Sequence, residues 1–389
     1  MKLATRCVQL GRAIGAHGAI APPIYQTATF EQPTATEFGE YDYTRSGNPT
    51  RTLLQEQLAD LEGANYACAF ASGMAALTAL TRIVKAGEEI IAGDDLYGGT
   101  VRLLDRIASH QNISVRYVDT TDVDNLTKAL TSRTRLILIE TPSNPLFRIS
   151  DIHALASIAQ NACSYLAVDN SMLSPVFQQP LNLGADIVVH SATKFLCGHS
   201  DVTAGALITN SPTLHQQIAF QQNAEGAGLS PFESWLLLRG LKTLALRVER
   251  QNASAQKIAR FLQTRAEVTR VFFPGLDHYP GREVHNKQAS GNGAVISFTT
   301  GDEKLSAEIV ETTRLFKIAV SFGSVGSTIS LPCRMSHASI PSALRDRLAP
   351  PSDLVRLSVG IEDVDDLILD LERAFAINSR EEQLEETVQ

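Results

Sequence analysis

The sequence is poor in cysteine, and its cysteines are not grouped. Cys7, Cys68, Cys163, Cys197 and Cys333 are scattered along 389 residues, and no Cys-x-x-Cys occurs. A zinc ribbon and a thioredoxin-like redox motif both need that spacing. We therefore expect no metal site, and reduced, mostly structural thiols of the kind found in cytoplasmic proteins.

Basic residues are in the minority. The chain has 34 Lys and Arg against 42 Asp and Glu, which gives a formal net charge of −8 at pH 7. Such a balance disfavours non-specific binding to nucleic acids or to anionic membranes. We expect no nucleic-acid partner, although a local basic pocket for an anionic cofactor is compatible with this charge.

Long hydrophobic runs are also lacking. The first ten residues include Thr5, Arg6 and Gln9 and contain no apolar core, so we expect no secretory signal. Residues 67–84 are apolar on average, but polar side chains interrupt them, and we interpret this stretch as a buried helix instead of a membrane span. The protein is expected to be cytoplasmic, with no membrane partner.

Two nucleotide-binding motifs are missing. No G-x-G-x-x-G follows the first strand candidate, and no G-x-x-x-x-G-K-[ST] occurs. A nicotinamide-dependent dehydrogenase and a P-loop enzyme are therefore disfavoured. A hydrophobic content of 44% with 20% charged residues is instead typical of an ordinary globular protein, with length enough for two cores.

Strand-length apolar runs alternate with helical periodicity from Pro49 to about Asn210. The strand candidates are residues 89–93, 114–118, 135–140, 164–169, 187–190 and 204–209. This alternation predicts an α/β fold whose large domain has a mostly parallel sheet covered by helices on both faces. Ligands in such folds bind at the carboxyl ends of the strands.

The rest of the chain predicts a smaller α+β domain. A helical stretch runs from Pro231 towards Arg265 with a bend near Gly240, and further strands are expected at 294–300 and 354–359 and helices at 305–316 and 364–375. The predicted organisation is an N-terminal arm (1–50), a large domain (51–245) and a small C-terminal domain (246–389).

A lysine and an aspartate stand at the ends of two predicted strands. Lys194 lies in His190-Ser191-Ala192-Thr193-Lys194, and Asp169 ends an earlier apolar run. This pattern suits pyridoxal 5'-phosphate (PLP): the lysine would hold the aldehyde, the hydroxyls the phosphate, and the aspartate the pyridine nitrogen. Taken alone, the pair equally fits a solvated lysine that follows a strand.

Other motifs lie at the same predicted edge. Gly73 and Met74 open an alanine-rich helix whose N-terminus can approach a phosphate, although close packing is an equal explanation. Tyr97 follows one strand and could stack on an aromatic ring, or could be an ordinary turn residue. Asn144 follows another strand, in Thr-Pro-Ser-Asn-Pro.

Three charged or phenolic residues lie far from this edge in sequence. Tyr43 and Arg45, in the N-terminal arm, could grip a phosphate, and because an arm does not easily fold over its own site the contact is expected in a neighbouring subunit. Arg356 lies within an apolar strand, where a buried guanidinium needs a partner. That partner is either a substrate carboxylate or a structural salt bridge.

Together these segments resemble the cysteine and methionine metabolism family of PLP-dependent enzymes, the trans-sulfuration enzymes. The resemblance extends from YDYTRSGNPT through SGMAAL, DLYGG, TPSNP, VDNS and HSATKF to VRLSVGIED. It implies fold type I, the aspartate-aminotransferase fold. Within the family, GDDLYGG, VDNSMLSP and SFGSVGSTISLPCRMSHASIP are most similar to the cystathionine β-lyase branch of the plant and cyanobacterial type.

The resemblance implies a role for each candidate residue. Lys194 carries the aldehyde, Asp169 partners the pyridine nitrogen, and Tyr97 stacks on the ring and assists catalysis. The phosphate is bound by Ser191, Thr193, Gly73 and Met74, and by Tyr43 and Arg45 of the adjacent subunit. The substrate is bound by Arg356, Ser321, Asn144 and Tyr43. A homotetramer of active dimers is implied as well.

The expected reaction is β-elimination from L-cystathionine to homocysteine, pyruvate and ammonia, in methionine biosynthesis. Family members that act at Cγ tend to carry glutamate where this sequence has Gly326. Cystathionine γ-synthase or γ-lyase activity is therefore the alternative, with amino-acid racemisation as a further side activity. A non-catalytic regulator on this scaffold is disfavoured because it would not need the lysine, the aspartate and the phosphate-binding residues together.

Overall fold

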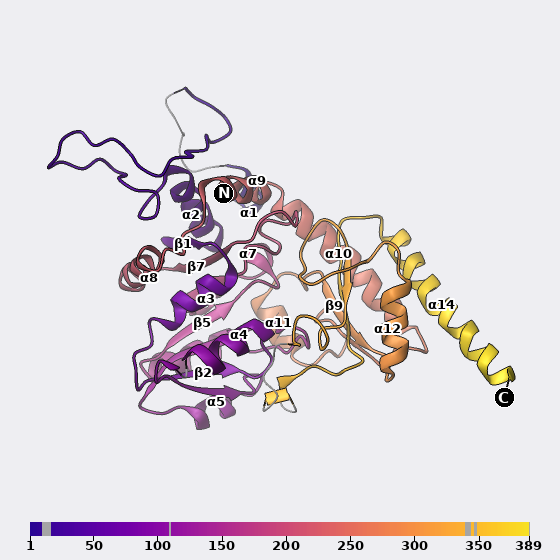
Figure 1. Ribbon diagram of the computed structural model, residues 1–389. Helices are drawn as coiled ribbons and strands as arrows, with labels where there is room; N and C mark the ends of the chain where they lie inside the picture. The colour runs from indigo at the N-terminus through magenta and orange to yellow at the C-terminus, as the bar shows by residue number, and fades with distance from the viewer. Residues whose placement is uncertain (10–16, 109, 339–343, 346–347, 389) are drawn as a thin grey trace.

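The structure is a computed structural model that describes residues 1–9, 17–108, 110–338, 344–345 and 348–388 (Figure 1). The chain forms two halves, each built around one β-sheet, and the long helix α10 (Leu244–Gln263) runs along the second half. An N-terminal arm projects from the first half. The C-terminal helix α14 (Val364–Val388) projects from the second, at the opposite end of the molecule.

The first half contains a seven-stranded sheet with the order β1-β7-β6-β5-β4-β2-β3. Its strands are β1 (Tyr66–Phe70), β2 (Glu89–Gly93), β3 (Ser114–Val118), β4 (Thr134–Glu140), β5 (Tyr165–Asp169), β6 (Ile187–His190) and β7 (Gly205–Thr209). Strands β2 to β6 pair in parallel, and only β7 runs against its neighbours. The predicted mostly parallel sheet is confirmed, and six carboxyl ends share one edge.

Helices cover both faces of this sheet. Ile90 and Ile91 are adjacent in β2, yet they belong to separate hydrophobic clusters, because successive strand side chains point to opposite faces. The helices of this half are α2 (Pro49–Glu62), α3 (Gly73–Thr81), α4 (Gly98–Arg102), α5 (Val123–Ala129), α6 (Ile152–Asn161), α7 (Ser174–Phe177) and α8 (Pro212–Ala224). A π-helical turn (Leu103–Ala108) and a 3₁₀ turn (Pro180–Leu183) complete it.

The helix expected over residues 67–84 is only partly correct. Tyr66–Phe70 forms strand β1, which pairs with β7, and α3 begins at Gly73. A short apolar run that is buried on both faces has no periodicity to distinguish a strand from a helix. The correction matters for the site, because the turn between β1 and α3 reaches the shared edge of the sheet.

The second half contains a five-stranded sheet with the order β10-β11-β12-β9-β8. Its strands are β8 (Arg270–Phe272), β9 (Val295–Thr299), β10 (Lys317–Ile318), β11 (Thr328–Ser330) and β12 (Val355–Ser358), and its helices include α11 (Arg282–Gln288) and α12 (Glu303–Thr312). The central pair, β9 and β12, is antiparallel and corresponds to the two strands predicted at 294–300 and 354–359.

The predicted bend near Gly240 is a break between two helices. Helix α9 (Pro231–Leu241) ends there, and α10 begins at Leu244. A Cβ at Gly240 would lie 2.4 Å from the carbonyl oxygen of Cys197, so only glycine allows this close approach. Arg247 of α10 donates hydrogen bonds to the carbonyls of Phe195 (2.8 Å) and Leu196 (3.4 Å). The two helices thus support the turn that follows β6.

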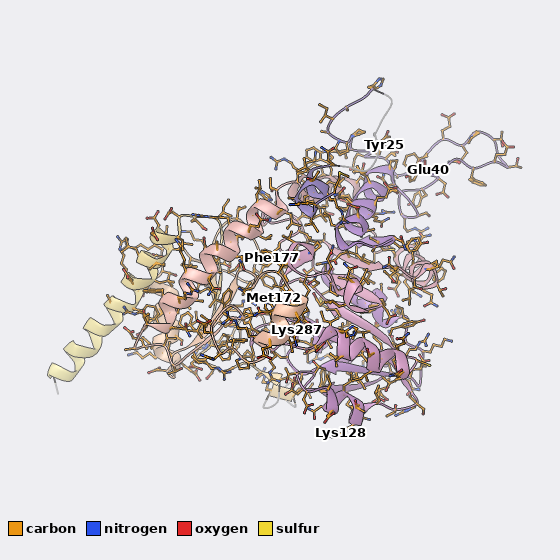
Figure 2. The ribbon with its side chains drawn as sticks, turned by 180° about the vertical axis from the view of Figure 1, so that it is seen from behind. Tyr25, Glu40, Lys128, Met172, Phe177 and Lys287 are labelled. Carbon is orange, nitrogen blue, oxygen red and sulfur yellow. The ribbon has the colours of Figure 1, made fainter. Side chains whose placement is uncertain are left out.

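The two halves share one hydrophobic core. Met172, Phe195, Val248 and Ala294 belong to the same buried cluster, and Met172 and Phe177 lie near the middle of the molecule in Figure 2.

The predicted domain boundaries at 50/51 and 245/246 stay a prediction. All five cysteines are free thiols. Among the described residues, no helix combines the length and the hydrophobicity needed to cross a membrane. The short helix α1 (Leu3–Val8) packs against α2 and α10.

Candidate active site

A cavity of about 450 Å³ lies where the carboxyl edge of the large sheet meets the second half. It brings together most of the residues selected from the sequence. These are Gly73, Met74, Tyr97, Asn144, Asp169, Ser191, Thr193, Lys194, Ser321 and Arg356. They come from loops that follow several strands of the first half, and from two segments of the second half. The cavity is therefore formed by the tertiary structure and not by any one motif.

Lys194 extends into the cavity from the turn that follows β6. The turn is closed by a 3.0 Å hydrogen bond from the Lys194 amide to the carbonyl of Ser191. The side-chain Nζ donates to Oγ of Ser321 at 2.5 Å and lies 4.9 Å from the ring centre of Phe322. The amine is thus held at a defined place by residues of the other half.

The surroundings of Lys194 lower the pKa of its amine. Burial and the neighbouring Arg356 lower the pKa of the Lys194 amine to about 8, against the opposing effect of Asp169 and Glu140. Near neutral pH an appreciable fraction of the amine is therefore uncharged. Only the uncharged form can attack an aldehyde or remove a proton.

Asp169 is the last residue of β5 and faces the same cavity. Its Oδ1 accepts a hydrogen bond from the Ser171 amide at 2.9 Å. Burial raises the pKa of this carboxyl, and hydrogen bonds from Ser171 and the nearby His190 and Lys194 oppose the rise. A buried acid of this kind is suited to a cationic ring nitrogen, which would supply the missing positive partner.

The N-terminus of α3 forms an anion-binding corner beside Ser191. The helix is capped by Ser72, whose Oγ accepts from the Ala75 amide at 3.0 Å, and its first residues, Gly73 and Met74, line the cavity. A Cβ at Gly73 would lie 3.0 Å from Cβ of Ser191. Glycine therefore allows Ser191 to reach the helix terminus, where a phosphate would meet both.

Thr193 lines the cavity, but its hydroxyl is already engaged. Its Oγ1 donates to the carbonyl of Ala204 at 3.2 Å and accepts from the Ala204 amide at 2.9 Å. This pair of bonds joins the lysine turn to the start of β7. Thr193 therefore fixes the turn, and a phosphate contact would require its hydroxyl hydrogen to leave the Ala204 carbonyl.

Tyr97 presents its ring at the cavity wall. It precedes α4, is 39% exposed, and meets His337 edge to face with ring centres 6.4 Å apart. A Cβ at Gly99 would lie 2.4 Å from the Tyr97 ring and 3.1 Å from Sδ of Met74, so the glycine makes room for the ring. The ring is placed where a flat cofactor could stack on it.

Arg356 is buried in β12 and points to the cavity. Nη1 donates to Oδ1 of Asn144 at 2.8 Å, and Nη2 donates to the backbone carbonyl of Ser321 at 3.1 Å. Burial lowers the pKa of the guanidinium to about 10, against the opposing effect of Glu140 and Tyr97. No carboxylate lies within salt-bridge distance of Arg356 among the described residues. The structural salt bridge considered for this residue is therefore not present there, and its contact with a substrate carboxylate stays a prediction.

Tyr43 and Arg45 do not line the cavity of their own chain. They lie in the arm, where Tyr43 is 43% exposed, and they border a different hollow of about 410 Å³ with Arg51 and Gly228. The arm projects away from the body of the molecule (Figure 1). Their expected contact with a neighbouring subunit stays a prediction.

The cavity also contains residues that the sequence interpretation missed. Arg102 and Glu140 line it, and His337 packs edge to face against the Tyr97 ring in its wall. Glu140 ends a strand, as Asp169 does, so the same pattern could have identified it. Arg102 is the last residue of α4, and nothing in its local sequence separates it from a solvated helix residue.

The residues present fit PLP. A weakly basic amine and a buried acid face one cavity, and a helix N-terminus with a serine hydroxyl provides a corner for the phosphate. Gly73 and Gly99 clear the space that side chains would occupy at the phosphate corner and behind the Tyr97 ring. The amine suits the aldehyde of the cofactor, the helix N-terminus and the serine suit its phosphate, and the buried acid suits its ring nitrogen.

The comparisons with known proteins agree with a site that fits PLP. The family model described as "Cys/Met metabolism PLP-dependent enzyme" matches residues 4–376. A chloroplastic cystathionine beta-lyase of Arabidopsis thaliana is 52% identical over 373 residues, which are 96% of this chain and 80% of the relative. A cystathionine beta-lyase of Neurospora crassa is 51% identical over 361 residues, or 92% of this chain and 79% of the relative.

A solved structure has the same fold. The crystal structure of a cystathionine gamma-lyase from Lactobacillus plantarum, complexed with L-serine, superimposes with a TM-score of 0.94. It is 41% identical in sequence and covers 97% of this chain and 99% of its own. The predicted fold type I is confirmed by this agreement over nearly the whole length.

Proposed function

The chain belongs to the family of PLP-dependent enzymes of cysteine and methionine metabolism, and on that premise we propose that it cleaves L-cystathionine by β-elimination. It is a carbon–sulfur lyase whose cofactor is pyridoxal 5'-phosphate. The products are homocysteine, pyruvate and ammonia. The observation that carries the proposal is the cavity in which Lys194, Asp169 and Arg356 meet, in a chain about half identical to two cystathionine beta-lyases.

The cofactor is held by residues of the first half. Lys194 would hold the aldehyde, Asp169 would partner the ring nitrogen, and Tyr97 would stack on the ring. Gly73 and Met74 at the start of α3, together with Ser191 and Thr193, would bind the phosphate. When bound, PLP supplies an acceptor for the electron pair that remains at Cα after its proton is removed.

Arg356 orients the substrate by its α-carboxylate. The guanidinium is fixed by Asn144 and the Ser321 carbonyl, so little side-chain entropy is lost when the carboxylate binds. Because Lys194 hydrogen-bonds the same Ser321, the carboxylate is held at a fixed relation to the amine. Orientation of this kind is worth several kcal/mol in favourable cases.

Lys194 then moves the proton. Its uncharged amine takes the proton from Cα. The electron pair left at Cα forms the double bond to Cβ, and the bond between Cβ and sulfur breaks with its own electron pair going to sulfur. The resulting thiolate becomes homocysteine after protonation. Water converts the remaining three-carbon enamine to pyruvate and ammonia. Tyr97, which also lines the cavity, would as its phenolate accept a proton from the incoming substrate ammonium group.

A second guanidinium is available for the far end of the substrate. Cystathionine carries an amino-acid group at each end, and Arg102 lines the same cavity as Arg356. We assign Arg102 to the distal carboxylate. This assignment gives the chain a basis for preferring long, doubly charged thioethers.

We further propose a homotetramer of active dimers in the cytoplasm. Tyr43 and Arg45 stand away from their own cavity, so a neighbouring chain is the place where they could complete a site. The arm also exposes apolar side chains, with Ile20 96% and Phe38 72% exposed, which a neighbouring chain would cover. Thiols without disulfides suit a reducing compartment.

Product analysis tests the reaction. The purified holoenzyme is incubated with L-cystathionine, and the keto acid is identified. Pyruvate with homocysteine supports β-elimination, whereas 2-oxobutyrate with cysteine indicates γ-elimination and would reject the proposal. The γ-lyase reaction is the second candidate, because a solved cystathionine gamma-lyase shares the fold at 41% identity.

Gly326 bears on that choice. The Cβ of an added side chain at this position would meet no atom within 4 Å, so the glycine is not there for lack of space. Space therefore does not explain why this chain lacks the glutamate that family members acting at Cγ tend to carry, and its absence favours the β reaction. Racemisation, which reprotonates Cα on the other face, is tested by incubating the enzyme with L-alanine and searching for the D-isomer.

A further inference from the structure

Glu140 is a buried acid in the cavity that the proposed reaction leaves without a role. It ends β4 and is directly aligned with Asp169 at the end of β5, so both side chains point to the same face of the sheet. Glu140 is 7% exposed and lines the active-site cavity. It also lines a small second cavity with Asp95, Ser143 and Arg148. The carboxyl group therefore stands in the wall between the two.

Glu140 has few groups that would stabilise a negative charge. Its Oε2 accepts a hydrogen bond from the Tyr97 amide at 3.3 Å, and no cation lies within salt-bridge distance of it among the described residues. Glu89, another buried glutamate, differs in both respects. It accepts from Arg116 at 3.1 Å and from the Thr131 hydroxyl at 2.7 Å. A buried carboxylate without such partners is costly.

The charges around Glu140 are of both signs. Asp169 on β5 and Asp95, in the loop after β2, are negative neighbours, and Asp94 precedes Asp95 in that loop. Arg356 on β12 is a positive neighbour, and Lys194 and Arg102 line the same cavity. Across the second cavity are Arg148, which pairs with Asp94 at 2.8 Å, and Asp119. His337 bonds to the Asn144 carbonyl beside Arg356.

These surroundings favour the uncharged acid. Burial raises the pKa of Glu140 well above its usual range, and the carboxylates of Asp169 and Asp95 raise it further. The Tyr97 amide and Arg356 oppose the rise. The geometry leads to the same conclusion, since one long hydrogen bond cannot replace the water that a carboxylate loses on burial.

We propose that Glu140 is a positioning residue that works as a neutral carboxylic acid, and that loss of its proton weakens the binding of a carboxylate at Arg356. The proposal rests on the assignment of Arg356 to the substrate α-carboxylate. A neutral Glu140 leaves the charge of Arg356 available to the substrate. An ionised Glu140 places a second anion near the same guanidinium, and the two anions repel each other across the cavity.

Protons and carboxylates are therefore linked at this site. Where Glu140 is already neutral, a carboxylate binds without proton uptake. At higher pH, where Glu140 is ionised in the free enzyme, each carboxylate that binds draws one proton onto Glu140. The apparent affinity then falls by about tenfold for each further pH unit.

Propionate is the probe for this linkage. It has a carboxylate but no amine, so it cannot displace Lys194 or be turned over, and the result does not depend on which products the enzyme makes. Its binding to the holoenzyme is measured by calorimetry from neutral to alkaline pH, in pairs of buffers that differ in their heat of protonation. The dependence of the heat on the buffer counts the protons taken up.

Glu140→Gln separates the two charge states, because the amide copies the neutral acid in shape and cannot ionise. We expect this variant to bind propionate at neutral pH as the parent does. At alkaline pH it should lack the fall in propionate affinity and the proton uptake that belong to Glu140. Tighter binding by Glu140→Gln at neutral pH would show that the parent carboxyl is ionised, and would overturn the proposal. An identical alkaline fall and proton count in both proteins would overturn it as well.

Asp95→Asn provides a second, independent measurement. It removes a negative neighbour that helps Glu140 to keep its proton, so the alkaline fall is expected at lower pH than in the parent. A fall that stays in place, or moves to higher pH, contradicts the proposal. The number of protons that the parent enzyme takes up on binding propionate is measured without any variant. The proposal can therefore be tested even if both variants fold poorly.

Discussion

Ser321 hydrogen-bonds both Lys194 and Arg356. Its hydroxyl accepts from Nζ of Lys194 at 2.5 Å, and its backbone carbonyl accepts from Nη2 of Arg356 at 3.1 Å. Ser321 also has a backbone φ of +82°, in the left-handed region that non-glycine residues rarely occupy. Such a conformation costs on the order of 1 kcal/mol and persists where the surroundings require it. One strained residue thus connects the proposed base with the proposed carboxylate site.

Paired replacements of Ser321 separate the hydroxyl from the strain. Ser321→Ala and Ser321→Gly both remove the acceptor for Lys194, and both are expected to lower kcat. Only glycine relieves the left-handed backbone, so we expect Ser321→Gly to be more stable than Ser321→Ala by about 1 kcal/mol. Denaturant unfolding measures the stability and steady-state kinetics measures kcat. Equal stability of the two variants would contradict the strain argument.

Arg356→Lys is expected to raise KM for cystathionine by roughly 10- to 100-fold. A lysine keeps the charge but loses the planar pair of donors, and charge-assisted hydrogen bonds are worth about 1.5–3 kcal/mol each. Propionate inhibition should weaken by a similar factor. Unchanged inhibition in this variant would mean that the carboxylate binds elsewhere.

Arg102→Ala tests the distal end of the substrate. We expect KM for cystathionine to rise about tenfold or more, because the far carboxylate loses its cationic partner. KM for S-methylcysteine, which has no far carboxylate, should remain within about twofold. If both substrates are affected equally, Arg102 does not bind the distal group and acts on the cavity as a whole.

The pH dependence of cofactor capture reports on Lys194. The amine must be uncharged to attack the aldehyde, and burial together with Arg356 lowers its pKa to about 8 from 10.5. The rate at which the cofactor-free protein takes up PLP is therefore expected to rise with pH and to level off above pH 8. Stopped-flow absorbance measures this rate. A rise that continues towards pH 10.5 would show that the site does not lower the pKa, and Lys194→Ala should show no capture.

Much of the site could be predicted from the sequence because its residues stand at the ends of strands. Asp169 follows an apolar run directly, and Lys194 follows another after a short polar turn. In a parallel sheet both positions reach the same edge. Glu140 ends a strand in the same way, so the same argument predicts its place at this edge.

Other features could not be predicted from local sequence. The strand Tyr66–Phe70 was expected to be helical, since its burial on both faces removes any alternation. The two hydrogen bonds between the Thr193 hydroxyl and Ala204, which fix the lysine turn, are likewise absent from the local pattern, and the contact of Thr193 with a phosphate stays a prediction. Arg102 is an ordinary helix arginine until the second half of the chain closes the cavity around it.

The sequence by itself determined the types of chemical group at the strand ends and the family to which the chain belongs, because those depend on residue identity and order. Only the tertiary structure decided which groups act on one another. Lys194 and Ser321 are far apart in the chain, and their contact exists because two sheets pack against a shared core. The basicity of the amine follows from that packing, since burial and the charge of Arg356 are properties of the folded site.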